Sequence, residues 1–321
     1  MAKKVIFTVL PLIIGFGFVY LSISNLSIEE RENLIKNVRE VNYKWIFLSL
    51  ILGTLSHVFR AMRWSTLLKT QKIESPFLLK FISVMICYLS NLGIPRSGEF
   101  LRAATFSTYT KSSFQPVFGT IVVERVIDLI MLGSIIIICL IFNFEALSNA
   151  IEYDAFFKAL IGILLLFFGF IIFLSKSKSR IAVFINKKFG GIKEGVLSIF
   201  KIENIWKFLL QTFLIWICYV LMFYVIKMAI NLSNEELTLN VIIVGFVAGT
   251  LALISTNGGI GIYPFTIGEV FRYFGLDIDL ALSYGWIHWA AQTFLVIFLG
   301  SISFLSLPLF SKKGDVKSVE D

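Results

Sequence analysis

Residues 91–102 read NLGIPRSGEFLR, and residues 257–272 read NGGIGIYPFTIGEVFR. Both stretches contain Asn-x-Gly-Ile, then a proline, then Gly-Glu-x-x-Arg, and each interrupts an apolar segment of membrane length. The hydrocarbon core of a bilayer offers no water to a broken backbone, so such a break persists only inside protein or beside a wet cavity. A pair of breaks, one in each half of a chain, is typical of the substrate site in membrane transporters.

The composition around these two stretches is that of a membrane protein. Of the 321 residues, 57% are hydrophobic and 15% are aromatic, far more than in soluble domains. Apolar segments close to the ~20 residues that cross ~30 Å of hydrocarbon recur along the chain. They lie at 5–23, 45–59, 77–95, 117–142, 156–174, 206–230, 239–256 and 281–309. We therefore predict an all-α, polytopic helical integral membrane protein with about eight spans.

The net charge of +8 is spread over separate loops, which argues against a nucleic-acid-binding face. Lysine and arginine gather before the first span, in 60–80, in 175–205 and in the C-terminal tail, whereas 143–155 and 231–238 carry only acids. Loops rich in lysine and arginine stay in the cytoplasm. We therefore expect a multi-pass protein of the cell inner (plasma) membrane, with the N- and C-termini cytoplasmic.

These loop positions constrain how often each segment crosses the membrane. Segment 77–113 must dip in from the cytoplasm and return, because one full crossing separates it from the external loop 143–155. By the same reasoning, 239–275 enters from outside and returns there. Hairpins that enter from opposite faces indicate an inverted repeat. We predict two re-entrant hairpins because the return limbs 96–113 and 265–278 are polar; two full crossings per hairpin, giving ten spans, is the alternative.

The chain is expected to form one domain. We assign residues 1–310 to a single transmembrane domain with 5–142 and 156–309 as approximate inverted halves, and residues 311–321 to a short cytoplasmic tail. The first apolar run is too long for a signal peptide and has no small-x-small cleavage site after it. We expect it to remain as a membrane anchor.

Charged residues at membrane depth are the strongest functional signal, since each costs several kcal/mol unless it is paired or hydrated. Glu and Arg of Gly-Glu-x-x-Arg share a helical face, and the break before them exposes a helix N-terminus, which attracts anions. Glu99 is matched by Arg102, so Arg96 lacks a carboxylate of its own and is a candidate phosphate clamp. The alternative is that each Glu–Arg pair only neutralises itself.

A second charged cluster lies inside the apolar segment 117–142. Glu124 and Asp128 share one helical face, and Arg125 points away from it. Two carboxylates on a buried face do not both remain charged without a cation. Three roles fit them: countercharge for Arg96 or Arg102, proton coupling, or a polar cluster that ties helices together.

These patterns give three groups of candidate residues and no catalytic one. The predicted substrate-binding residues are Asn91, Arg96, Arg102, Asn257 and Arg272. The predicted charge-balance or coupling residues are Glu99, Glu124, Arg125, Asp128 and Glu269. The predicted backbone breaks are Gly93, Pro95, Gly98, Gly259, Gly261, Pro264 and Gly268. No metal-ligand spacing, cofactor loop or catalytic motif is present, so we expect no metal, no cofactor and no enzymatic activity.

Three motifs together resemble the lysylphosphatidylglycerol synthase transmembrane region family, also called flippase-like. They are the stretch 91–102, Glu124-Arg125-x-x-Asp128, and the run from Gly258 through Pro264 to Glu269. The resemblance covers most of the chain and implies a protein that moves lipids between leaflets. Bifunctional members carry a soluble aminoacyl-transferase domain after the membrane part. Only residues 310–321 follow the last predicted span, so we expect a stand-alone member without that domain.

The resemblance and the charged motifs together predict a lipid flippase or transporter. Its cargo is expected to be an anionic phospholipid or a polyprenyl-phosphate-linked lipid, and its candidate protein partners are envelope-lipid biosynthetic enzymes. Two other classes stay open: a membrane-embedded transferase that uses a lipid-linked donor, and a non-transporting scaffold of envelope lipid synthesis.

Overall fold

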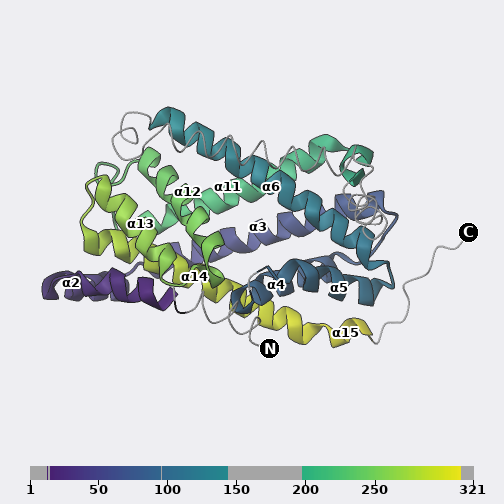
Figure 1. Ribbon diagram of the computed structural model, residues 1–321, viewed down its shortest axis with the longest axis horizontal. Coiled ribbons are helices and arrows are strands. Elements are labelled where there is room, and N and C mark those ends of the chain that lie inside the picture. The colour runs from purple at the N-terminus through teal and green to yellow at the C-terminus, as the bar shows by residue number, and fades with distance from the viewer. Residues whose placement is uncertain (1–12, 14, 95, 144–196, 312–321) are drawn as a thin grey trace, which may run out of the picture.

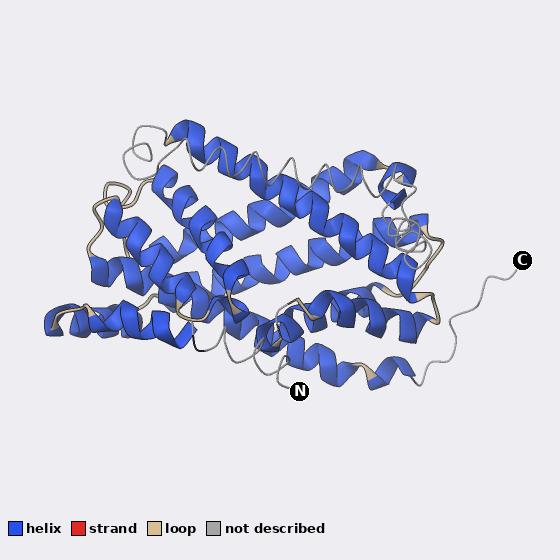
Figure 2. Cartoon of the chain, in the orientation of Figure 1, coloured by secondary structure: helices blue, strands red, loops and turns tan. Residues whose placement is uncertain are grey.

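The computed structural model describes residues 13, 15–94, 96–143 and 197–311, and within these ranges every regular element is a helix (Figure 2). The all-α prediction is therefore confirmed for this part of the chain. The predicted span 156–174 lies outside the described residues. The elements, in order, are a helix at Gly15–Ser24, α2 (Ile28–Arg39), α3 (Tyr43–Thr70), α4 (Phe77–Gly93), α5 (Gly98–Thr110), α6 (Phe114–Phe142), η1 (Leu197–Lys201), α11 (Ile205–Ala229), α12 (Leu239–Ser255), η2 (Asn257–Gly259), α13 (Ile262–Tyr273), α14 (Ile278–Ser306) and α15 (Pro308–Ser311).

Four helices in the described part are long and apolar enough to cross a membrane: α3, α6, α11, and α14 continued into α15. The 28 residues of α3 extend about 42 Å at 1.5 Å per residue, which exceeds the ~30 Å of hydrocarbon. Our prediction of a span at 45–59 was too short, since no glycine or proline interrupts the chain between Gly53 and Pro76. The helix continues to Thr70 and carries two arginines with it.

Two pairs of shorter helices form hairpins, α4 with α5 and α12 with α13, and the limbs of each pair contact one another. Figure 1 shows α4 and α5 toward the end of the molecule that holds α15, and α12 and α13 toward the opposite end. The two breaks meet between them, because a Cβ on Gly258 would lie 2.6 Å from Leu92 Cδ2. Breaks far apart in the sequence are thus adjacent in space.

Each break contains residues in the left-handed region of backbone space. In the first it is Arg96, with φ 59°, and in the second they are Gly258, Gly259 and Gly261, with φ between 62° and 70°. Glycine adopts this conformation without a steric cost, whereas a residue with a Cβ is strained there. The second break is therefore the one whose backbone depends on glycine.

The buried apolar residues form two clusters that hold the hairpins in place. One packs Trp64 and Phe106 against Phe208 and involves α3, α5, α6 and α11. The other packs Phe223 of α11 against Phe271 of α13 and Tyr284 of α14. Each hairpin therefore has its own apolar support, and α11 takes part in both.

Candidate functional site

The candidate site contains two buried arginines of α3, Arg60 and Arg63. Neither of them was among the site residues predicted from the sequence. Arg60 and Arg63 are 2% and 0% exposed, whereas we had assigned them to a cytoplasmic loop. They continue a buried face that includes His57 and Trp64, at the three- and four-residue spacing of one helical stripe. The absence of a glycine or proline between Gly53 and Pro76 was the signal that could have placed these arginines in a helix instead of a loop.

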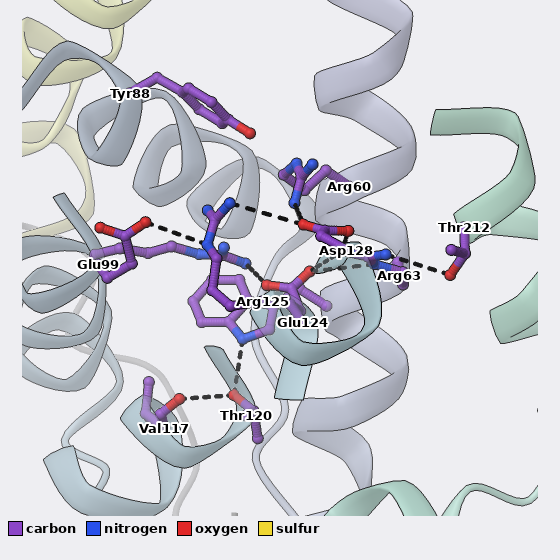
Figure 3. Close-up of polar contacts among 12 residues, drawn as sticks. Arg60, Arg63, Tyr88, Glu99, Val117, Thr120, Glu124, Arg125, Asp128 and Thr212 are labelled. Atoms are coloured by element: carbon purple, nitrogen blue, oxygen red, sulfur yellow. Dashed lines mark hydrogen bonds and ion pairs between the residues drawn. The ribbon is translucent and has the colours of Figure 1, made fainter. Parts of the chain in front are cut away.

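Asp128 on α6 binds both of these arginines (Figure 3). Its Oδ2 lies 2.7 Å from Arg60 Nη1, and its Oδ1 lies 2.9 Å from Arg63 Nη2. Arg63 also donates from Nη1 to Thr212 Oγ1 on α11, at 3.3 Å. The aspartate thus fixes α6 to α3 through two charge-assisted hydrogen bonds, which are stronger than neutral ones.

Glu124, one turn earlier on α6, bridges α3 and α5. Its side chain is fully buried, with Oε2 2.7 Å from Arg102 Nη2 and Oε1 3.5 Å from Arg63 Nε. This contact fits two of the three roles that the sequence left open for Glu124, countercharge for Arg102 and a polar cluster that ties helices together. The predicted match of Arg102 with Glu99 is wrong, because the packing of α6 against α5 brings a different carboxylate to Arg102.

The guanidinium of Arg102 is enclosed on its other side by an aromatic ring. Its central carbon lies 3.9 Å from the centroid of the Trp64 ring, and Trp64 Nε1 donates to Thr120 Oγ1 at 2.9 Å. A desolvated cation over tryptophan gains about 2 kcal/mol or more. Arg102 is 0% exposed, so in this conformation its predicted partner, a lipid phosphate, has no direct access to it.

Glu99 and Arg125 form the accessible end of the cluster. Arg125 Nε lies 3.2 Å from Glu99 Oε1, and the two side chains are 33% and 21% exposed. Asn91 Nδ2 donates to Glu99 Oε2 at 3.4 Å, and Asn91 Oδ1 accepts from the Gly98 N–H at 2.8 Å. Asn91, predicted to bind substrate, here caps the N-terminus of α5. It thereby links α4 to α5 across the first break.

Seven charged residues therefore form one connected network, which we call the α5–α6 network. It contains Arg60, Arg63, Glu99, Arg102, Glu124, Arg125 and Asp128. Four arginines face three carboxylates, so these residues together carry one excess positive charge. Arg60 Nη2 also donates to the Tyr219 hydroxyl at 3.1 Å, and that oxygen lies 3.3 Å from the Tyr88 hydroxyl.

The second hairpin has no comparable network among the described residues. Arg272 pairs with Glu269 of its own helix, and their side chains are 58% and 38% exposed. The buried polar contact nearby is neutral: the Tyr263 hydroxyl lies 2.7 Å from His288 Nδ1. The self-neutralising alternative therefore describes α13 and does not describe α5.

The remaining predicted residues fall at the two breaks. Arg96 is exposed, and no ion pair to it occurs within the described ranges. Gly98 and Gly268 are buried in close packing against Cys87 and Leu282, and Pro264 packs against Gly285. Gly93 ends α4 in open space. Pro95 lies outside the described residues, and so does the side chain of Asn257, whose backbone begins η2.

Comparison with known proteins gives the same family as the motifs. The model of the family described as lysylphosphatidylglycerol synthase TM region matches residues 8–300, which confirms the resemblance. The chain is also 25% identical over 284 residues to a UPF0104 membrane protein of Pyrococcus horikoshii, an alignment that covers 78% of this chain and 84% of that protein. No solved structure matches the chain. Together with the long apolar helices, these matches show a multi-pass membrane protein.

Proposed function

This chain belongs to the lysylphosphatidylglycerol synthase TM region family, and from that premise we propose that it is a lipid transporter. It moves an anionic phospholipid or a polyprenyl-phosphate-linked lipid from one leaflet to the other, without a catalytic step of its own. Its ligand is a membrane lipid with a phosphate headgroup, and envelope-lipid biosynthetic enzymes are the partners that supply or use that lipid.

The observation that carries this proposal is the excess of buried arginine in the α5–α6 network. Arg60, Arg63 and Arg102 are each at most 2% exposed and lie on α3 and α5, inside the helix bundle. Holding helices together does not require these charges, because apolar residues of similar size often serve as well or better. Charges inside a membrane bundle instead mark the path of a charged substrate, and a guanidinium fits phosphate oxygens.

The proposal includes the membrane topology. The 13 residues of α5 and the 12 residues of α13 extend only about 20 Å and 18 Å, less than the ~30 Å thickness of the hydrocarbon. These lengths support two re-entrant hairpins that meet near mid-depth as parts of an inverted repeat. In this arrangement both termini are cytoplasmic, and the membrane is the inner (plasma) membrane.

In the proposed mechanism, the headgroup enters beside the tips of the hairpins while the acyl or prenyl chains stay in lipid. The arginines of the α5–α6 network neutralise the phosphate where water is scarce and electrostatic attraction is strong. The carboxylates Glu124 and Asp128 keep the arginines compensated when no headgroup is bound. The chain thereby lowers the cost of moving a charge through hydrocarbon.

Leaflet exchange in liposomes tests this function. Purified protein is reconstituted with a trace of fluorescent phosphatidylglycerol or fluorescent polyprenyl phosphate, and a membrane-impermeant quencher reports the fraction in the outer leaflet. We expect the wild type to expose the inner-leaflet probe and Arg125→Gln to slow this at least tenfold. Arg39→Gln, on the exposed surface of α2, is the control for a lost arginine. Folded protein that exchanges neither probe would refute the proposal.

A further inference from the structure

The α5–α6 network is closed at one end and open at the other. Arg63, Arg102 and Glu124 have side chains that are 0% exposed, whereas those of Arg125 and Glu99 are 33% and 21% exposed. A ligand that approaches the network therefore meets Arg125 first. Arg102, which the sequence predicted to bind substrate, lies behind Trp64 and Glu124.

Of the three carboxylates in this network, Glu99 has the longest closest contact to an arginine. Its Oε1 lies 3.2 Å from Arg125 Nε, whereas Asp128 and Glu124 each have an oxygen 2.7 Å from an arginine nitrogen. Arg60 and Asp128, by contrast, approach to 2.7 Å with hydrogen-bond geometry. Charge-assisted hydrogen bonds normally span about 2.7–2.9 Å, so Glu99 is held less firmly than the other carboxylates.

Glu99 also lies at the end of a helix where negative charge is favoured. It lies in the first turn of α5, directly after the break that Asn91 caps through the Gly98 N–H. The first N–H groups of a helix and its positive dipole end attract negative charge. The Glu99 carboxylate contacts Arg125 and the Asn91 amide, two groups that can also donate to a phosphate oxygen.

The net charge of the network indicates which headgroup can replace the Glu99 carboxylate. With Glu99 in place the network carries one excess positive charge, from four arginines and three carboxylates. A phosphodiester carries one negative charge, as a carboxylate does. Exchanging one for the other leaves the charge of the network unchanged, which keeps the cost of the buried charges constant between the empty and loaded states.

We propose that Glu99 is an internal substitute for a lipid phosphodiester: it binds Arg125 at the start of α5 in the empty protein and is displaced when the headgroup arrives. Arg125, assigned from the sequence to charge balance, is thereby the first residue to bind the headgroup. This inference rests on the proposed function. Competition from Glu99 for Arg125 keeps the binding of the lipid phosphodiester reversible.

Binding measured on the purified full chain in detergent tests this exchange. The probe is dioctanoyl phosphatidylglycerol, a soluble lipid with one phosphodiester, titrated by calorimetry. Because Glu99→Gln removes the competing charge and keeps the side-chain size, we expect it to bind the probe about tenfold more tightly. Arg125→Gln is expected to weaken binding at least tenfold. Glu32→Gln, on the exposed surface of α2, is the matched control for a neutralised glutamate.

The double variant Glu99→Gln/Arg125→Gln shows whether the effect passes through Arg125. We expect its affinity to equal that of Arg125→Gln alone, since the two single effects are coupled. Unchanged or weaker binding by folded Glu99→Gln would overturn the inference, and so would equal tightening in both backgrounds. Glu99→Ala, with the same expected direction, replaces Glu99→Gln if that variant does not elute as a folded species.

Two further measurements are needed. One distinguishes a lipid from free phosphate as the ligand, and the other distinguishes this inference from the proposed transport function. Inorganic phosphate at the same concentration is expected to leave lipid binding intact; displacement of the lipid by phosphate alone would overturn the assignment to a lipid. Tighter binding by Glu99→Gln in a protein that shows no leaflet exchange would support the exchange of ligands and refute transport. Leaflet exchange by the wild type with no effect of Glu99→Gln on binding would refute this inference alone.

Discussion

The two copies of Gly-Glu-x-x-Arg share a sequence pattern and differ in what they bind. In α13, Glu269 and Arg272 pair with each other on an exposed surface. In α5 the corresponding residues separate: Glu99 contacts Arg125, and Arg102 contacts Glu124. The motif sets the start of a helix and the three-residue spacing of two charges, but it does not choose their partners.

The neighbouring helices make that choice. Beside α5 lie α3 and α6, which supply Arg63, Glu124 and Asp128. Beside α13 lie α12 and α14, whose contacts with it include the ring of Tyr284 and the neutral His288–Tyr263 pair. Glu269 and Arg272 of α13 therefore pair with each other. One hairpin is therefore stabilised by buried ion pairs and the other by apolar packing.

The largest effect that tests this difference should come from Glu124→Gln. It leaves Arg102 buried without its carboxylate and Arg63 with Asp128 alone, and breaking a buried pair costs about 3–5 kcal/mol. Glu269→Gln breaks an exposed pair and should cost less than about 1 kcal/mol. Thermal unfolding in one detergent measures both. Equal losses of stability would contradict the account of a buried and an exposed pair.

A smaller loss is expected when the ring below Arg102 is removed. Trp64→Leu deletes a cation–π contact of about 2 kcal/mol and leaves Thr120 without the indole donor. Trp64→Phe keeps a ring at this position and should lose roughly half as much. The unfolding midpoints of the two variants, compared with the wild type, measure the contribution of the ring. A Phe variant as unstable as the Leu variant would show that the ring itself contributes little.

The smallest effect compares the two breaks. Gly258→Ala forces a Cβ into a residue with φ 62° and against Leu92, which costs about 1–2 kcal/mol. Gly93→Ala adds a Cβ in open space at the end of α4 and should change stability by less than about 1 kcal/mol. Unfolding of both variants distinguishes them. If Gly93→Ala were the more damaging, the second break would not be the one that depends on glycine.

Part of this architecture follows from the sequence alone. Composition gave the helical membrane class, because a chain with 57% hydrophobic residues cannot hide that surface in a soluble domain of this size. The paired breaks followed from glycine and proline within apolar runs. The contact of Glu124 with Arg102 was among the roles predicted, since a buried carboxylate requires a cation.

Other parts required the three-dimensional packing. Arg60 and Arg63 were placed in a loop because hydropathy falls where charges begin, although the helix continues through them. Glu99 was matched to Arg102 by helical spacing, while in space Arg125 of α6 lies closer. Local spacing indicates which residues can meet within one helix, and it says nothing about a competing partner on the next helix. The adjacency of Leu92 and Gly258 could not be derived from spacing either.

Leaflet exchange of fluorescent phosphatidylglycerol in proteoliposomes, measured for Arg125→Gln and Arg272→Gln at equal amounts of folded protein, distinguishes the two hairpins. We propose that the headgroup binds the α5–α6 network and does not bind the exposed pair of α13. We predict at least a tenfold slower exchange for Arg125→Gln and less than a twofold change for Arg272→Gln. Equal slowing by both substitutions, or none by Arg125→Gln, would contradict the claim.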